Sequence, residues 1–288
     1  MSDSKWFMEL TRKLQLDKNN VDTIYSILNE ISDIINFEYY NKRISEEYAF
    51  VTGSLSRKTA IDLENVDVMV QIPLYMYRRY SLHSEKGPYM LVEDVYKKIK
   101  KNFIYTRLSK DGKIILDYKE IRFNILPSFK LEDETFLYPE VLDSVWINLD
   151  IKKSLEVFNL RDKENKGNMR NFCKLLKLWN IKNRINLSEI LIDSMVYEFF
   201  KDYTFGKIRG FNYYDYYFYD FFKYIINKGP DYFWYIPATS IELKPRSPYL
   251  LNKKVKESFE IVKKAMDLYI KKYPHLSKEN WELLLGKI

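Results

Sequence analysis

The sequence contains very little cysteine or histidine. Its 288 residues include one cysteine, Cys173, and two histidines, His83 and His275. A single cysteine excludes an intrachain disulfide, and a zinc site built from cysteine and histidine needs more of these residues than the chain has. We therefore expect any bound metal to be a hard cation held by oxygen atoms. Cys173 is interpreted as a small core residue on the apolar side of a helix.

Long apolar runs are missing as well. No run reaches the ~18 residues of a membrane-spanning helix, and the N-terminal Met1-Ser-Asp-Ser-Lys-Trp6 lacks the apolar core of a signal peptide. We therefore expect a cytoplasmic protein without membrane insertion. With 46% hydrophobic and 30% charged residues, the composition is that of a globular chain of about two domains. The net charge of +7 favours polyanionic partners, either nucleotides or nucleic acid.

The most informative stretch covers residues 51–70. An apolar strand leads into Gly53-Ser54, and ten residues later Asn65-Val66-Asp67 opens a second strand. Glycine lets the backbone approach an anion closely, and serine adds a hydroxyl group. Residues two apart on a strand share a face, so positions 65 and 67 are placed to hold a metal ion that bridges nucleotide phosphates. An ordinary surface turn before a buried strand is the alternative, but it would leave Asp67 facing a core without a partner.

This spacing of Gly53-Ser54 and Asn65-Val66-Asp67 resembles the signature of the DNA polymerase β-like nucleotidyltransferases, Gly-Ser followed by Asp-x-Asp. Arg57, Thr59 and Ile61 resemble the segment after Gly-Ser in the branch that contains oligoadenylate synthetase, cyclic GMP-AMP synthase and the bacterial antiphage CD-NTases. The resemblance implies an α/β (α+β) protein with a two-lobed nucleotidyltransferase fold. One lobe carries a mixed sheet, the C-terminal lobe is helical, and the active site lies in the cleft.

The resemblance also implies a domain division. Residues 1–150 would form the catalytic lobe with an N-terminal bracing helix, and residues 151–288 would form a helical, nucleotide-binding lobe. The bracing helix is independently predicted by apolar residues at spacings of three and four, namely Val21, Ile24, Ile27, Leu28, Ile31, Ile34 and Ile35. The sequence has no low-complexity linker at the boundary near residue 150.

Further elements of the first lobe follow from apolar patterning. Strands are expected at 66–73, 113–118 and 121–127, and a helix at 92–103. Pro127 is expected to end its strand because proline withholds an N–H group from the ladder. Residues 75–88, including His83, are interpreted as a loop or lid, and residues 131–150 as a connector toward the other lobe.

The strand at 121–127 resembles the family strand that carries the third carboxylate just before a proline. Asn124 stands at that place. By resemblance, the catalytic and metal positions are therefore Asn65, Asp67 and Asn124, and two of the three are amides. An amide keeps the shape of a carboxylate but lacks its negative charge. Affinity for the two Mg²⁺ or Mn²⁺ ions of an active form should fall severely.

Three explanations compete for the two asparagines. They were introduced to trap an inactive form, they mark a natural pseudoenzyme, or other carboxylates replace them, namely Asp62, Glu64, Asp117 or Glu120. Replacement is the weakest explanation, because Glu64 points to the strand face opposite Asn65. Asp62 lies outside the strand in which side chains alternate between the two faces. We favour introduced substitutions because both departures are the same isosteric change in a chain that otherwise keeps the pattern.

A second motif lies on a helix predicted for residues 168–179. One face carries Met169, Phe172, Cys173, Leu176 and Trp179, and the other carries Arg170, Lys174 and Lys177 and is expected to be solvated. Lys177-Leu178-Trp179, followed by Ser188, resembles the Lys-x-Trp and Ser pair that grips the triphosphate in this branch. Ser188 is also expected to be the N-cap of the next helix.

Aromatic residues crowd the stretch from 203 to 235. Most are expected in the core, because aromatic rings bury large areas. Tyr232 and Trp234 are the candidates for stacking on a nucleotide base.

The implied function is a metal-dependent nucleotidyltransferase that polymerises nucleoside triphosphates into a cyclic or linear oligonucleotide, a signal in antiphage defence. Gly53, Ser54, Lys177 and Ser188 would hold the triphosphate, and a downstream effector protein is a further possible partner of the product. The chain as given is expected to bind nucleotide with negligible turnover. Two alternatives stay open: a non-catalytic nucleotide- or nucleic-acid-binding pseudoenzyme, and an enzyme that adds a nucleotide to RNA or protein.

Overall fold

The computed structural model describes residues 3–41, 47–83, 85–203 and 213–287. It divides into two compact units. The sheet unit comprises Leu16–Ser56 and Asp62–Lys153, and the helical unit comprises Met1–Gln15, Arg57–Ile61 and Ser154–Ile288. The division therefore falls close to residue 150, but it places the N-terminal segment and a short internal segment with the helical unit.

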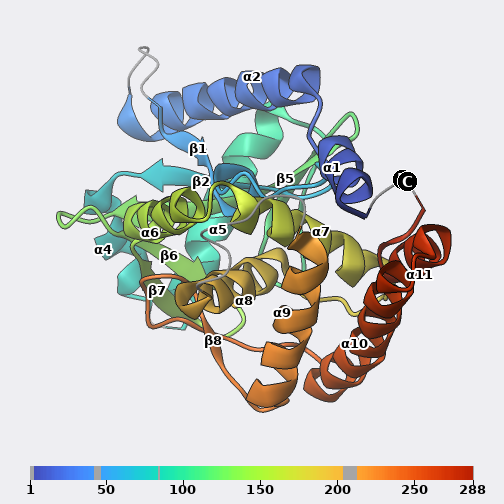
Figure 1. Cartoon of the computed structure of the whole chain (residues 1–288). Coiled ribbons are helices and arrows are strands. Elements are labelled where there is room, and N and C mark those ends of the chain that lie inside the picture. Colours follow the sequence, from blue (N-terminus) through green and yellow to red (C-terminus); the bar gives the residue numbers. More distant parts are fainter. Residues whose placement is uncertain (1–2, 42–46, 84, 204–212, 288) are drawn as a thin grey trace. The chain divides into compact units, whose positions relative to one another are not determined.

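The sheet unit is built on a seven-stranded mixed sheet with the strand order β1-β2-β5-β4-β3, in which β6 also pairs with β5 and β7 pairs with β6 (Figure 1). The central strands β2 and β5 are parallel, and the other pairs are antiparallel. The strand bounds are β1 Ala49–Val51, β2 Val66–Ile72, β3 Thr106–Leu108, β4 Ile114–Tyr118, β5 Ile121–Lys130, β6 Phe136–Glu140 and β7 Val145–Leu149. The strands expected from apolar patterning are thus present, and the sheet is mixed.

Helices cover one face of this sheet. The helical bounds are α2 Lys18–Ile35, the π-helical turn η1 Asn36–Tyr40, α3 Gly53–Ser56, the 3-10 turn η2 Leu74–Met76, α4 Tyr77–Ser81 and α5 Gly87–Asn102. The apolar stripe of α2 and that of α5 share a core with Val66, Val68 and Val70 of β2. Because side chains alternate along a strand, Asp67 lies on the opposite face of the sheet.

The expectation that Pro127 ends its strand is wrong. Strand β5 continues through Pro127 to Lys130. On one edge of β5, pairing with β4 stops at Ile125 and pairing with β6 starts at Phe129. Pro127 lies between these two partners, so the N–H group that it lacks is not needed there.

Two other segments differ from expectation. Residues 75–88 are not a loop, since they form most of η2, all of α4 and the start of α5. Pro88 lies in the first turn of α5, where a missing N–H group leaves no helical bond unmade. Residues 131–150 are not a plain connector, because they contain the antiparallel hairpin of β6 and β7.

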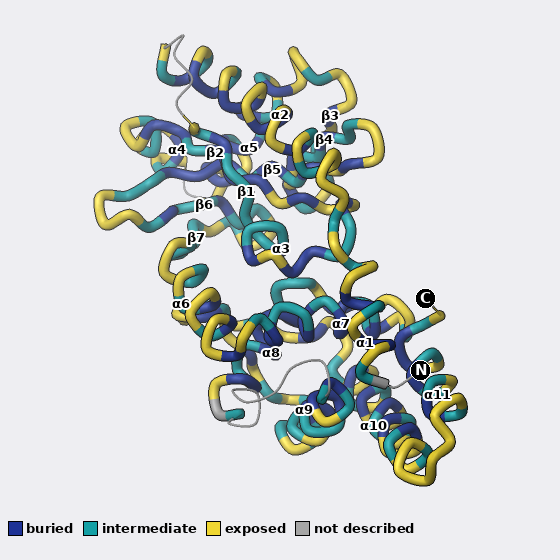
Figure 2. Tube along the Cα trace, turned by 45° about the horizontal axis from the view of Figure 1, so that its top comes forward, coloured by how far each residue is buried: buried dark blue, intermediate teal, exposed yellow. Residues whose placement is uncertain are grey.

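The helical unit packs its helices around an aromatic core. Its bounds are α1 Asp3–Lys13, α6 Ile151–Glu164, α7 Asn168–Lys182, α8 Glu189–Asp202, α9 Tyr214–Lys228, α10 Pro248–Ile270, α11 Pro274–Leu285 and the short strands β8 Trp234–Tyr235 and β9 Glu242–Leu243. Buried residues run along α7, α8 and α9 (Figure 2). Phe172 lies at their centre and makes edge-to-face contacts with rings of α8 and α9. The described aromatic residues of the stretch from 203 to 235 are therefore mainly core, as expected, and residues 204–212 lie outside the described part of the chain. Of the described helices, none is both long and apolar enough to cross a membrane.

Candidate functional site

Gly53 is the first residue of α3, two residues after the end of β1, and lies directly beside Asp67 of β2. Its φ of +61° lies in the left-handed region, which glycine adopts without strain. A Cβ atom at this position would overlap Asp67 Oδ2. The amide of Thr52 donates a hydrogen bond to the carbonyl oxygen of Asp67 at 2.8 Å, which holds the turn against the strand. A glycine is therefore required here for two independent reasons. Ser54, the next residue, is buried.

Asp67 and Asn124 lie side by side on neighbouring strands. They are direct partners in the parallel register of β2 and β5. The side-chain amide of Asn124 donates a hydrogen bond from Nδ2 to Asp67 Oδ1 at 3.2 Å. Asn65 is exposed and immediately precedes β2. The structure thus brings together two of the positions expected from sequence, on the sheet face opposite the one that α2 and α5 cover.

The side chains at these positions do not fit a pair of divalent cations. Asp67 is the single carboxylate of the three, and it already accepts a hydrogen bond from an amide. Two doubly charged ions need several anionic oxygens, which one carboxylate and two amides do not provide. Across the described part of the chain, no group of three or more histidine, cysteine, aspartate or glutamate residues is placed to hold a metal ion.

Two of the four other candidate carboxylates, Asp117 and Asp62, are engaged elsewhere. Asp117 forms ion pairs with Arg122 at 2.7 Å and with Arg107 at 3.3 Å. Asp62 accepts a hydrogen bond from the backbone amide of Glu64 at 3.1 Å, as in a turn. These contacts make Asp62 and Asp117 poor replacements for the missing carboxylates.

Lys177 does not lie on a solvated face. Its side chain is only 2% exposed, and Nζ donates a hydrogen bond to Thr59 Oγ1 at 2.9 Å. The ammonium also forms ion pairs with Glu189 at 3.2 Å and Asp193 at 3.4 Å. The expectation of a solvated Lys177 is therefore wrong, because α8 supplies carboxylates that allow α7 to bury a cation.

Asp193 is the centre of this network. It is 1% exposed, and its Oδ2 accepts hydrogen bonds from Arg57 Nε and Thr59 Oγ1, both at 2.8 Å. Burial acts to raise the pKa of Asp193, but the charges of Lys177 and Arg57 and the two hydrogen bonds outweigh it and lower the pKa. Sequence reasoning missed Asp193, although an acid inside the apolar run Ile190-Leu-Ile-Asp-Ser-Met-Val196 was a usable signal.

The other two cations of α7 have different surroundings. Arg170 donates from Nε to the carbonyl oxygen of Arg57 at 2.8 Å and from Nη1 to Asp162 at 2.8 Å. Lys174 is half-buried, and within the described residues it has no hydrogen bond or ion pair. Burial, followed by the charges of Lys177 and Arg170, lowers the pKa of Lys174.

Ser188 occupies the N-cap position of α8, as expected, and is exposed. Its side chain makes no capping hydrogen bond to any described residue. The residue before it, Leu187, is fixed instead by Asn180, which donates to the Leu187 carbonyl oxygen at 3.1 Å and accepts from the Leu187 amide at 2.9 Å. The hydroxyl of Ser188 is therefore presented on an anchored backbone.

Tyr232 and Trp234 contact each other edge-to-face, with ring centroids 4.8 Å apart. Trp234 is 2% exposed and belongs to the core, whereas Tyr232 is partly exposed. The hydroxyl of Tyr232 donates to Glu198 at 2.6 Å, and Lys228 Nζ lies 4.0 Å from its ring centroid. Of the two rings, only that of Tyr232 has an accessible surface on which a base could stack.

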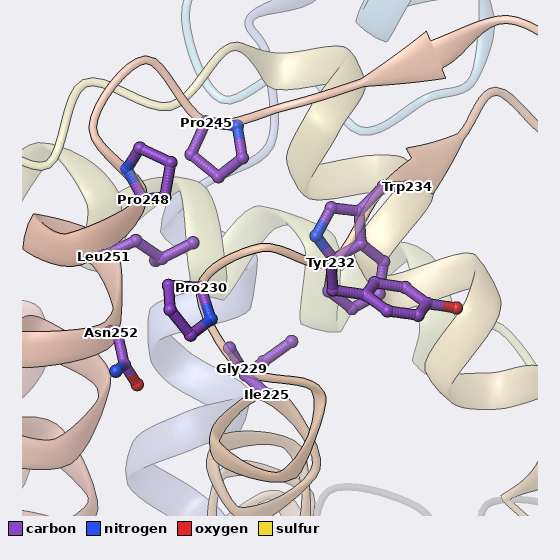
Figure 3. A pocket seen from close by; sticks show the side chains of 9 residues that line it. All are labelled: Ile225, Gly229, Pro230, Tyr232, Trp234, Pro245, Pro248, Leu251 and Asn252. Carbon is purple, nitrogen blue, oxygen red and sulfur yellow. The ribbon is translucent and has the colours of Figure 1, made fainter.

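Both rings border a small apolar pocket, in which they lie together on one side (Figure 3). Its lining consists of Ile225, Gly229, Pro230, Tyr232, Trp234, Pro245, Pro248, Leu251 and Asn252. The pocket has room for about one water molecule, so it cannot admit a nucleotide base without moving its walls.

Comparison with known proteins defines the class. The model of the Second Messenger Oligonucleotide or Dinucleotide Synthetase domain matches residues 1–159. No curated protein sequence matches. Among solved structures, CdnC of E. coli MS115-1 with ATP is 15% identical with a TM-score of 0.69, covering 99% of this chain and 98% of that one. The Vibrio cholerae di-nucleotide cyclase DncV is 12% identical with a TM-score of 0.69, covering 96% and 93% of the two chains.

These likenesses show a two-lobed nucleotidyltransferase fold, with one lobe built on a mixed sheet and the other helical. A further structure, CdnE c-di-GMP synthase of Capnocytophaga granulosa, is 13% identical with a TM-score of 0.62, covering 90% of this chain and 87% of that one. Because the family model matches more than half of its residues, the chain belongs to the second messenger oligonucleotide or dinucleotide synthetases. The resemblance to the CD-NTase branch is thereby confirmed.

Proposed function

We propose that this chain is a nucleotidyltransferase that joins nucleoside triphosphates into a cyclic or linear oligonucleotide, in a form disabled by the asparagines at positions 65 and 124. The observation that carries the proposal is the register pairing of Asp67 with Asn124 beside the turn at Gly53. In this arrangement one carboxylate and one isosteric amide share a face of the sheet next to a backbone that can approach phosphate closely.

Family membership supports nucleotide polymerisation in general. Mg²⁺ or Mn²⁺ enters the proposal only for a form with aspartate at both positions, where three carboxylates would supply the anionic oxygens that hard cations require. In the chain as given, Asp67 is a hydrogen-bond acceptor for an amide. We assign to this form nucleotide binding with negligible turnover.

The triphosphate is assigned to the turn at Gly53 and Ser54 and to Ser188, whose exposed hydroxyl makes no capping bond to the described residues. Lys177 is assigned an indirect role. Thr59 and the two carboxylates already surround its ammonium, so it acts on the triphosphate through its charge and not through a direct hydrogen bond. Tyr232 is assigned to the base, and Trp234 supports its ring from the core.

An antiphage signal made in the cytoplasm and read by an effector protein is a further part of the proposal, by analogy with the CD-NTase branch. The E. coli CdnC is recorded in complex with a HORMA protein, and a regulatory protein partner is proposed here on that likeness. The rival function is a nucleotide-binding pseudoenzyme, which the hydrogen bond between Asn124 and Asp67 favours.

Calorimetric titration of the chain with each of the four ribonucleoside triphosphates tests the binding half of the proposal. Binding of at least one triphosphate, without pyrophosphate release, is expected. If none binds to folded protein, either with or without Mg²⁺, both the disabled-enzyme and the pseudoenzyme proposals fail.

A further inference from the structure

The ten residues between Gly53-Ser54 and Asn65 are anchored at their middle. Arg57–Ile61, which we call the strap, belongs to the helical unit, while the residues before and after it belong to the sheet unit. Its first residue follows α3 directly, and its last lies a few residues before Asn65. Because peptide bonds link these segments, fixing the strap constrains both the turn at Gly53 and the start of β2.

Hydrogen bonds from two helices hold the strap. Asp193 of α8 accepts from Arg57 Nε and from Thr59 Oγ1 at 2.8 Å. From α7, Lys177 donates to Thr59 Oγ1 at 2.9 Å, and Arg170 donates to the carbonyl oxygen of Arg57 at 2.8 Å. The hydroxyl of Thr59 thus donates to one partner and accepts from another, which fixes its orientation.

This anchor is buried and polar. Thr59 is 0% exposed and Arg57 is 9% exposed. Replacing a buried ionic cluster by apolar residues often leaves stability unchanged or improves it, so stability alone is a weak reason for this arrangement. A cluster of directional bonds does impose a single geometry on the strap, which apolar packing of a five-residue segment would define less sharply.

We propose that Asp193 is a positioning residue for nucleotide binding, which fixes the strap and thereby restricts the backbone of the Gly53 turn before it and of the segment that leads to Asn65 after it. It also holds Lys177 in the same network, so one carboxylate orders residues from both motifs. This inference rests on the proposed function, since nucleotide binding is its consequence.

Two variants remove the anchor conservatively. Asp193→Asn keeps the shape of the side chain and removes its charge, and Thr59→Val removes the hydroxyl at nearly constant volume. Ser258→Ala is the matched control, because it breaks a buried hydrogen bond of the same unit, from Trp179 Nε1 to Ser258 Oγ at 2.8 Å, that does not involve the strap. All three are compared at a temperature at which each is folded.

Two readouts are used on the full chain. Hydrogen–deuterium exchange without nucleotide should be faster at residues 53–61 in Asp193→Asn and Thr59→Val, and unchanged there in Ser258→Ala. Titration with the triphosphate that the parent binds should show about tenfold weaker binding per folded molecule for the first two variants. The double variant should be no weaker than Asp193→Asn alone, because both changes release the same strap.

Unchanged affinity in folded Asp193→Asn and Thr59→Val, with loss of stability alone, would overturn the inference. If the parent binds no triphosphate, the proposed function fails, and the exchange rates alone then test whether Asp193 anchors the strap. Faster exchange at residues 53–56 in the two variants would support this anchoring, and unchanged exchange there would refute it.

Discussion

Gly53 and Asp67 are packed so closely that no larger residue fits at position 53, where a Cβ atom would overlap Asp67 Oδ2. Gly53→Ala should therefore displace the carboxylate of Asp67 and also strain a backbone with φ of +61°. We expect a loss of stability of about 2 kcal/mol or more, with weaker nucleotide binding. Thermal melting and titration of the folded variant measure the two effects.

The matched control is Gly167→Ala. Gly167 has φ of +81°, and apart from its own backbone and its chain neighbours no described atom lies within 4 Å of the position that its Cβ would take. This control carries backbone strain without overlap, so it should cost only about 1 kcal/mol and leave nucleotide affinity unchanged. Equal losses for the two variants would show that the contact with Asp67 is unimportant.

Lys177→Ala should unfold the protein more easily. The change removes one of the two cations that face the buried Asp193, the other being Arg57, and breaking one partner of a buried ion pair costs about 3–5 kcal/mol. Denaturant unfolding measures this cost. Lys174→Ala on the same helix is the control; because Lys174 has no ion pair to the described residues and lies near two cations, its removal should not lower stability. A stable Lys177→Ala with weakened triphosphate binding would instead indicate a phosphate ligand.

The stability of the protein should depend on the charge of Asp193 in acid. Its pKa in the folded state is lowered, from an unfolded value of about 3.9. The carboxylate therefore stabilises the fold fully above that value, and the contribution is lost as pH falls through the lower, folded pKa. The melting temperature of the parent should exceed that of Asp193→Asn at pH 7, and the difference should shrink below about pH 4. A difference that stays constant down to pH 3 would contradict this.

Trp234→Ala should act mainly on stability. The indole is 2% exposed, and emptying such a site costs about 3–5 kcal/mol. Tyr235→Ala, at a neighbouring side chain that is 44% exposed, is the control and should change stability little. If Trp234 stacks on a base, nucleotide would quench its fluorescence and folded Trp234→Ala would bind poorly. Normal affinity per folded molecule would remove it from the site.

The sheet and its polar face could be predicted from the sequence because their signals are local. Alternating residues mark β2, and Gly53, Asp67 and Asn124 stand at recognisable spacings. The register that pairs Asp67 with Asn124 depends on a parallel crossover between distant strands. Apolar pattern alone does not fix it, and the resemblance to a known family supplied that part.

The surroundings of Lys177 could not be predicted in this way. A cation opposite an apolar stripe usually faces water. Lys177 is buried instead because it contacts Asp193 and Thr59, which are far from it in sequence. The hairpin of β6 and β7 was missed because its residues mix charges with aromatic rings and show no clean alternation. Long-range partners decided the first case, and an irregular local pattern decided the second.

The central claim is that asparagines at positions 65 and 124 disable an otherwise intact nucleotidyltransferase site. Metal ligands act as a unit, so Asn65→Asp or Asn124→Asp alone should recover far less activity than the two together. Two controls are required, namely the parent chain and the doubly substituted chain carrying Asp67→Asn as well. Both should release negligible pyrophosphate.

The most direct measurement is pyrophosphate release, with mass spectrometry of the products, from the Asn65→Asp/Asn124→Asp chain supplied with nucleoside triphosphates and Mg²⁺ or Mn²⁺. The account predicts metal-dependent release and a cyclic or linear oligonucleotide that the parent chain does not make. A folded double variant that binds nucleotide but releases no pyrophosphate with either metal would contradict it and leave the binding function in its place.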